Sequence, residues 1–171
     1  MLVRFTARFS ALHILLSALT VLAAVSQVAA QDQLTKLRAQ YAAQTDPIDK
    51  ARALAKLSLR EMSAARDLVK DNEDEKALEA LGHFRDEVVA TTQALVGMGV
   101  DASRRSKGFK ELQISLRMFI SRLDDLILTL PQDERPLFRA VKADLDSSEN
   151  TLIDALFPAR PPKRPQEARP K

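Results

Sequence analysis

One uninterrupted apolar stripe constrains the fold of this 171-residue chain more than any other feature. Between residues 109 and 130 the apolar positions alternate spacings of three and four, which is the period of one face of an α-helix. The stripe consists of Phe109, Leu112, Leu116, Phe119, Leu123, Leu126 and Leu130. Ile120 and Ile127 make it wider than the seam of a coiled coil. So long an apolar face must pack against other helices, and Pro131 ends it.

Two helices are expected before residue 71. A short one is predicted from about residue 32 to 44, followed by a long one from Pro47 to about Lys70. Asp46 is a good N-cap for the long helix, and proline fits its first position. The stripe expected on the long helix is Ile48, Ala51, Ala55, Leu59, Met62, Ala65 and Val69, with Leu54, Leu57 and Leu68 beside it.

Two further helices are expected around the central stripe. One follows the junction at Asp71 and Asn72 and stops at Gly97–Gly99, where glycine can supply a left-handed residue. The other has Asp133 as its cap and Pro136 in its first turn. Their expected stripes are Leu78, Leu81, Phe84, Val88, Thr92, Leu95 and Val96, and Leu137, Phe138, Val141, Leu145, Leu152 and Leu156.

These elements predict an all-α fold in residues 31–157. Four helices of about 24–28 residues, each roughly 35–40 Å long, are joined by short connections. The prediction is an antiparallel up-and-down helical bundle of four long helices, with the short N-terminal helix continuing or capping one end. An extended array of helical hairpins is the alternative.

Residues 1–30 have the pattern of a secretory signal peptide. Arg4 and Arg8 precede an uncharged apolar run, Phe9 to Ala30, which closes on small residues. An uncleaved membrane anchor is the alternative, because the run is long enough to span a hydrocarbon core of about 30 Å. Both readings predict that residues 31–171 are exported, to the periplasm or the extracellular space. After signal cleavage no membrane span is expected.

The net charge of +3 is unevenly distributed. Residues 31–157 carry 19 basic and 22 acidic residues, whereas residues 158–171 carry five basic residues and one glutamate. An acidic body argues against nucleic-acid binding, which needs a basic stripe on the folded part. The tail is expected to be disordered, with polyproline II character. It could hold the protein against an anionic envelope polymer or lipid headgroups, or it could simply be a solubilising terminus.

The absence of cysteine excludes several chemistries. It removes disulfides, thiolate nucleophiles, Cys-ligated zinc and iron–sulfur clusters. Helix packing alone must therefore stabilise this exported domain, and no cofactor is predicted.

His83 is the only imidazole after residue 30, and it lies four residues from both Glu79 and Glu87. The three side chains share a helix face and could hold a divalent metal, although a closed site usually needs a fourth ligand from another helix. The simpler interpretation is a surface histidine with ordinary salt-bridging neighbours. One histidine cannot also serve a Ser–His–Asp triad, and no catalytic residue is predicted.

A basic cluster is predicted at the start of the helix that carries the central stripe, residues 109–130. It comprises Arg104, Arg105, Lys107 and Lys110. A helix N-terminus disfavours cations, and such a local conflict can mark a site for a phosphate, a lipid headgroup or an acidic partner. A frayed first turn with ordinary ion pairs is the alternative. The sequence thus predicts a non-enzymatic protein that binds an unidentified protein partner or an anionic cell-envelope polymer; a small-ligand or metal-binding bundle is the alternative.

Overall fold

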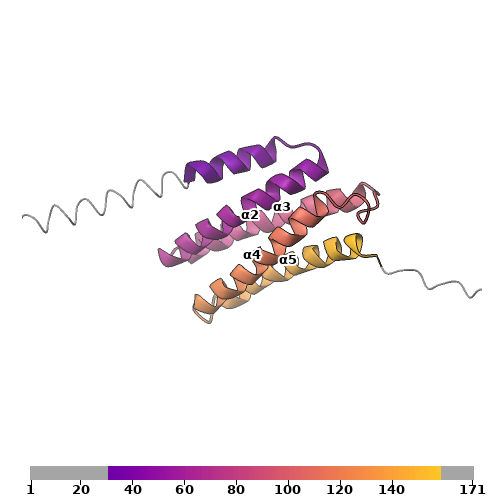
Figure 1. The fold of residues 1–171 in the computed structure, drawn as a ribbon. Helices are drawn as coiled ribbons and strands as arrows, with labels where there is room; N and C mark the ends of the chain where they lie inside the picture. The colour runs from indigo at the N-terminus through magenta and orange to yellow at the C-terminus, as the bar shows by residue number, and fades with distance from the viewer. Residues whose placement is uncertain (1–30, 159–171) are drawn as a thin grey trace, which may run out of the picture.

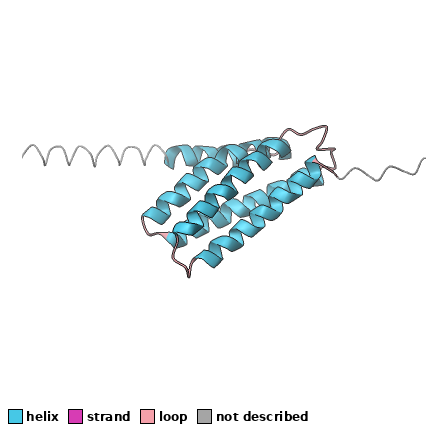
Figure 2. Cartoon of the chain, turned by 60° about the horizontal axis from the view of Figure 1, so that its bottom comes forward, coloured by secondary structure: helices cyan, strands magenta, loops and turns pink. Residues whose placement is uncertain are grey.

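The computed structural model describes residues 31–158, which form a bundle of helices (Figure 1). A helix over residues 31–42 is followed by α2 (Pro47–Lys70), α3 (Asp74–Gly97), α4 (Phe109–Thr129) and α5 (Arg135–Leu156). No strand occurs among these residues (Figure 2). The predicted all-α bundle is therefore confirmed. The predicted signal segment, 1–30, and the tail from residue 159 onward lie outside the described residues.

Two of the long helices, α2 and α3, have the expected length, whereas α4 and α5 are shorter and one connection is longer than expected. The four helices span 24, 24, 21 and 22 residues, against the predicted 24–28. The difference is largest before α4, where residues 98–108 form a connection between α3 and α4 instead of additional helical turns. This connection is long enough to cross the end of the bundle.

The helices are arranged around the bundle in the order α2, α3, α5, α4. Each of α2 and α5 packs against both α3 and α4, so α3 and α4 lie diagonally across from each other. The chain still alternates in direction from one helix to the next (Figure 1). However, the neighbours that are not consecutive in the chain run parallel. Arg66, near the end of α2, meets Asp125, near the end of α4, and α3 and α5 share the opposite direction because the chain alternates. The long 98–108 connection makes this order possible.

Local signals set most helix ends. The Asp46 carboxylate accepts hydrogen bonds from the backbone N–H groups of Ile48 and Asp49 at 2.9 and 3.1 Å, so it caps α2 as predicted. Asn72 has a left-handed φ of 58° at the α2–α3 turn. The predicted cap of α5 is wrong by one residue: Glu134, not Asp133, stands at the N-cap and makes no side-chain capping bond.

The core is built on the stripe that the sequence showed most clearly. All nine apolar residues of the predicted α4 stripe, from Phe109 to Leu130, are buried. At the centre of the bundle the rings of Phe84 and Phe119 stack with centroids 4.4 Å apart and planes at 24°. This contact joins the diagonal helices α3 and α4, so the core is continuous across the bundle.

The other stripes were predicted with small rotational errors. Leu59 of α2, Val96 of α3 and Leu137 of α5 are exposed rather than buried. In α2 the buried face is centred on Leu54 and Leu57, which were expected beside the stripe, and it includes Glu61, which was not expected there. Glu61 is buried because the helix over residues 31–42 does not continue or cap an end of the bundle, as predicted, but lies along α2 and α3 and covers that side (Figure 1). Within residues 31–158 no helix has the length and apolarity needed to cross a bilayer.

Candidate functional site

The predicted basic cluster lies almost entirely outside a helix. Arg104, Arg105 and Lys107 belong to the 98–108 connection, and only Lys110 lies in the first turn of α4. The prediction that the cluster starts a helix was therefore wrong for three of its four residues. Only Lys110 occupies the first turn of α4, where the helix dipole disfavours a cation.

One of the four cations is neutralised locally. Arg104 Nε lies 3.3 Å from Asp101 Oδ2. Hydrogen bonds from the Ser103 hydroxyl and backbone N–H hold the Asp101 carboxylate and keep its pKa below the usual range. Among the described residues Arg105, Lys107 and Lys110 have no acidic side chain within ion-pair distance. Three exposed positive charges therefore remain available at this end of the bundle.

Gly108 fixes the connection against α2. Its φ of 84° is left-handed, and a Cβ there would lie 3.0 Å from Ile48 Cγ2 and 3.2 Å from the Ile48 backbone. The Glu111 carboxylate accepts a hydrogen bond of 2.5 Å from the Gly108 N–H, which orients the entry into α4. The first turns of α2 and α4 therefore lie together, and the positive ends of both helix dipoles add to the charge of the 98–108 connection.

A seam between α2 and α4 runs from this end along the bundle. Ser58 and Ser115 meet across it through their hydroxyls, and Ser115 Oγ also donates to the Ala55 carbonyl at 2.9 Å. Two turns later Arg66 Nη2 lies 3.8 Å from Asp125 Oδ2 and 3.4 Å from the Arg122 carbonyl oxygen. The two contacts fix the parallel register of the helices.

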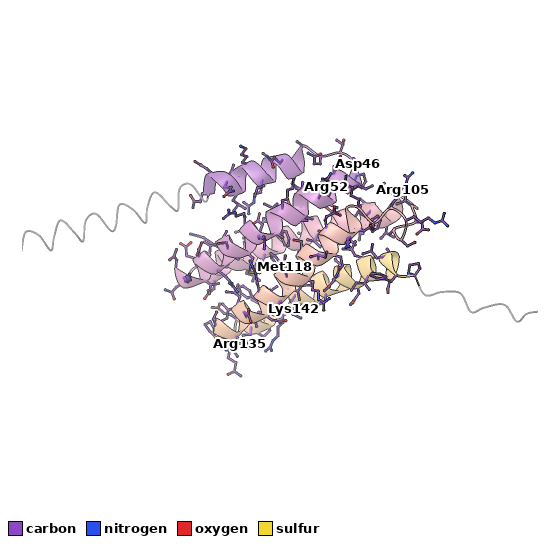
Figure 3. All side chains as sticks on the ribbon, viewed as in Figure 1. Asp46, Arg52, Arg105, Met118, Arg135 and Lys142 are labelled. Atoms are coloured by element: carbon purple, nitrogen blue, oxygen red, sulfur yellow. The ribbon has the colours of Figure 1, made fainter. Side chains whose placement is uncertain are left out.

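This register brings two exposed apolar side chains together. Leu59 precedes Arg66 by two turns on α2, and Met118 precedes Asp125 by two turns on α4. Because the helices are parallel, the two apolar residues stand on opposite sides of the same seam. They are 41% and 44% exposed, and Ile114, one turn before Met118, is 46% exposed. Figure 3 shows Met118 near the middle of the bundle, away from Arg105, which lies in the 98–108 connection at one end of the bundle.

Basic side chains surround these apolar residues. We give the name α2–α4 face to nine residues on the outward side of these two helices: Leu59, Arg66, Lys110, Glu111, Ile114, Arg117, Met118, Arg122 and Asp125. Its two acids already have partners, since Glu111 binds the Gly108 N–H and Asp125 pairs with Arg66. Among the described residues Lys110, Arg117 and Arg122 have no acidic partner. A shallow, open depression at the start of the face is lined by Ser106, Lys107, Lys110, Glu111 and Ile114.

Charge is segregated between the two halves of the bundle. The basic layer, formed by α2, α4 and residues 98–108, carries twelve basic and seven acidic residues, whereas the acidic layer, formed by α3 and α5, carries five basic and nine acidic residues. The basic layer therefore has a net charge of +5 and the acidic layer a net charge of −4, and the two nearly cancel in their sum. Because α2 lies next to α4 and α3 next to α5, the segregation is a property of opposite faces.

The predicted metal-binding strip does not close around a common point. His83 Nε2 lies 3.8 Å from Glu79 Oε1, and both side chains are about three-quarters exposed. Glu87 is instead half-buried beside Glu61 and Arg38, and burial raises its pKa first, with the negative charge of Glu61 adding to the effect. Within residues 31–158 no group of three or more His, Asp or Glu side chains is arranged to hold a metal ion.

A buried polar cluster under the N-terminal helix was missed by the sequence analysis. Arg38 donates to both carboxylate oxygens of Glu61 at 2.6 and 2.8 Å, which raises the pKa of Arg38. Tyr41 is buried, its hydroxyl lies 3.0 Å from the Thr91 hydroxyl, and burial raises its pKa. One signal was available: Glu61 lies four residues after Leu57 and seven after Leu54, on a face that is otherwise apolar. These contacts anchor residues 31–42 and are partnered within the chain.

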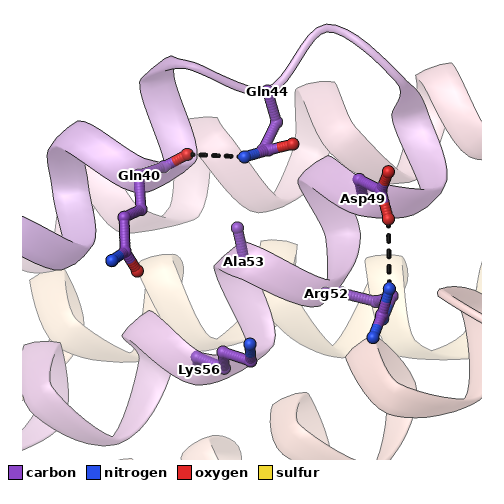
Figure 4. Close-up of a pocket in the computed structure, with 6 residues that line it drawn as sticks. All are labelled: Gln40, Gln44, Asp49, Arg52, Ala53 and Lys56. Atoms are coloured by element: carbon purple, nitrogen blue, oxygen red, sulfur yellow. Dashed lines mark hydrogen bonds and ion pairs between the residues drawn. The ribbon is translucent and has the colours of Figure 1, made fainter.

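A second depression lies between the same N-terminal helix and α2 (Figure 4). It is lined by Gln40, Gln44, Asp49, Arg52, Ala53 and Lys56. Several of its polar groups already bind one another: Gln44 Nε2 donates to the Gln40 carbonyl at 3.3 Å, and Arg52 Nη1 lies 3.1 Å from Asp49 Oδ1. Polar groups that already bind one another leave few free hydrogen-bonding or charged groups for a ligand, so the α2–α4 face is the stronger candidate site.

Carboxylates gather at the end of the bundle opposite the 98–108 connection. Glu134, at the N-cap of α5, faces Asp74, at the start of α3. One carboxylate oxygen of each is enclosed without a hydrogen-bond partner among the described residues. The pKa of Glu134 is raised by desolvation and then by the charge of Asp74.

Comparison with known proteins adds no assignment. No protein-family model, curated protein or solved structure matches the chain.

Proposed function

We propose that this protein is a non-enzymatic helical bundle that acts outside the cytoplasm by binding a protein or a charged surface of the cell envelope. The observation that carries the proposal is the separation of charge between the basic layer and the acidic layer. Opposite faces of opposite charge orient a protein at a charged partner and accelerate encounter with it. Export rests on the composition of residues 1–30.

The α2–α4 face gives this proposal a definite surface. Lys110, Arg117 and Arg122 are exposed cations without acidic partners among the described residues, and they stand on one helix. Binding a partner through these cations has a small free-energy cost, because no existing ion pair of the fold has to be broken. The face can therefore act in binding without disturbing the core.

Cell fractionation with salt washes tests the proposal. The full chain is expected in the envelope fraction and is expected to leave it as the salt concentration rises, because exposed charge interactions are screened over about 8–10 Å at physiological ionic strength. A variant with Arg117→Glu should leave at lower salt than the parent. Arg139→Glu, an equivalent change at an exposed position of α5, is the matched control.

Two results would contradict the proposal. If the chain is recovered entirely outside the envelope fraction at low salt, binding to the envelope is excluded. If the parent, the Arg117 variant and the Arg139 variant are all retained regardless of salt, retention does not depend on the charged faces.

A further inference from the structure

The apolar centre of the α2–α4 face is a feature that charge alone does not explain. Leu59 and Met118 flank the seam, and Ile114 stands one turn before Met118. A partner that only carried negative charge would leave these three side chains in water. The face therefore fits a partner that offers anions at its surface and an apolar layer directly beneath them.

The same face is a poor fit to other occupants. A symmetric pair of copies would bring Lys110, Arg117 and Arg122 of both copies into one interface, where the only acids of the face already have partners, and the like charges would repel. Three side chains that are each less than half exposed also supply far less than the roughly 800 Å² per partner of a standard interface. A helix from another protein needs a deep apolar groove, whereas the depression on this face is shallow and open and is bordered by Lys107, Lys110 and Glu111.

We propose that the α2–α4 face docks on the surface of an anionic lipid bilayer. The proposal rests on the proposed function and names the surface that the protein would bind. Lysine and arginine side chains reach headgroup phosphates while their stems lie along apolar material. Leu59, Ile114 and Met118 enter the boundary between headgroups and acyl chains, and the unbranched methionine adapts to it. The 98–108 connection adds Arg104, Arg105 and Lys107 at one end of the contact.

The absence of tryptophan from the chain permits a position-specific test. Met118→Trp places a single indole in the face of the full chain, and Leu137→Trp places one at an exposed position of α5, in the acidic layer. Each variant is mixed at low salt with vesicles of phosphatidylglycerol or of phosphatidylcholine, with and without bromine on the acyl chains. The position of the probe matters because residues 1–30 could bind vesicles by themselves.

The proposal predicts a response at one position and with one lipid. The emission of the Met118→Trp variant should shift to shorter wavelength on phosphatidylglycerol and lose intensity when the acyl chains carry bromine. It should not do so on phosphatidylcholine, and the Leu137→Trp variant should respond to neither. In the Met118→Trp background, Arg117→Gln should weaken the response about fivefold, as expected for one basic residue near an anionic surface, while Arg139→Gln should leave it unchanged.

Each other outcome overturns the proposal. An unchanged spectrum at position 118 shows that the face stays in water, and equal responses at both positions or with both lipids show that another part of the chain binds. A spectral shift that depends on protein concentration without vesicles shows that a second copy covers the face. If vesicles have no effect but salt-sensitive envelope retention persists in cells, the bilayer proposal fails while the proposed function stands.

Discussion

Replacement of Arg38 by methionine tests how the N-terminal helix is held to the bundle. The two partners of its ion pair differ in exposure: the side chain of Glu61 is 4% exposed and that of Arg38 is 49% exposed. Loss of Arg38 leaves a carboxylate without its cation in a nearly dry position, and breaking a buried pair in this way typically costs about 3–5 kcal/mol. Loss of Glu61 leaves a half-exposed guanidinium that can return to water, so Glu61→Met should cost only about 1 kcal/mol.

Undocking of residues 31–42 sets an upper limit on the first cost. The helix buries Tyr41, while Leu34 and Leu37 are only partly buried, so its docking is worth on the order of a few kcal/mol. Once this helix has left the bundle, water reaches the Glu61 carboxylate, so the free-energy cost of losing Arg38 cannot exceed the cost of undocking the helix. Arg38→Met is therefore expected to free the N-terminal helix, at about 2–3 kcal/mol by the same reasoning, before the four-helix core is lost.

Hydrogen exchange and urea unfolding of residues 31–171 measure these effects. Arg38→Met should speed exchange of the amides in residues 31–42 and leave those of α4 protected. The double variant with Glu61→Met should regain most of the lost protection, because it removes the buried charge as well as its partner. Arg139→Met on α5 controls for the loss of an exposed arginine. If the two single variants are equally destabilised, or the double variant is no better than Arg38→Met, the reasoning from unequal burial is refuted.

Three further predictions concern the core, the acidic end and the entry into α4. Leu123→Asp should abolish cooperative unfolding seen by circular dichroism, because Leu123 is 0% exposed and a charge there would have no partner; unchanged melting would contradict its core position. Glu134→Gln should raise the melting temperature near neutral pH. Because the pKa of Glu134 is raised in the folded state, the stability that its protonated form contributes is present below the unfolded pKa and is lost as pH rises through the folded pKa. In acid the parent carboxyl is neutral like glutamine, so the gain in melting temperature should vanish there. A gain that is independent of pH would argue against this cause. Gly108→Ala should destabilise by more than the roughly 1–2 kcal/mol of a left-handed alanine, because the new methyl meets Ile48, whereas Gly99→Ala at φ 63° has open space and should show the backbone cost alone; equal losses in urea unfolding would remove the steric argument.

The helices of the bundle were predictable because their signals are local. The apolar period from Phe109 to Leu130, the cap at Asp46 and the left-handed Asn72 depend on residues only a few positions apart. The stripe of α2 was less predictable, since its buried side depends on a helix that covers it from outside. The apolar period of α2 therefore predicted Leu59 in the core, whereas Leu59 is 41% exposed on the α2–α4 face.

The candidate site was only partly predictable. The basic residues Arg104, Arg105, Lys107 and Lys110 were identified from their clustering in the sequence. Their combination with Met118 and Leu59 was not, because it requires the parallel register of two helices that are not consecutive. The metal-binding alternative for His83 depended on helix spacing alone, and spacing does not show that Glu87 is half-buried, with Glu61 among the charges around it.

The sequence by itself determined that residues 31–157 form long amphipathic helices that cannot rely on disulfides, since periodicity, caps and composition act locally. Only the tertiary structure decided that α2 lies beside α4 and α3 beside α5, that the N-terminal helix covers α2 and α3, and that charge separates onto opposite faces. The physical reason is that apolar stripes require burial but do not specify which stripe covers which. The 98–108 connection, held by Gly108 against Ile48, brings the start of α4 beside the start of α2, and the α2–α4 face follows from that contact.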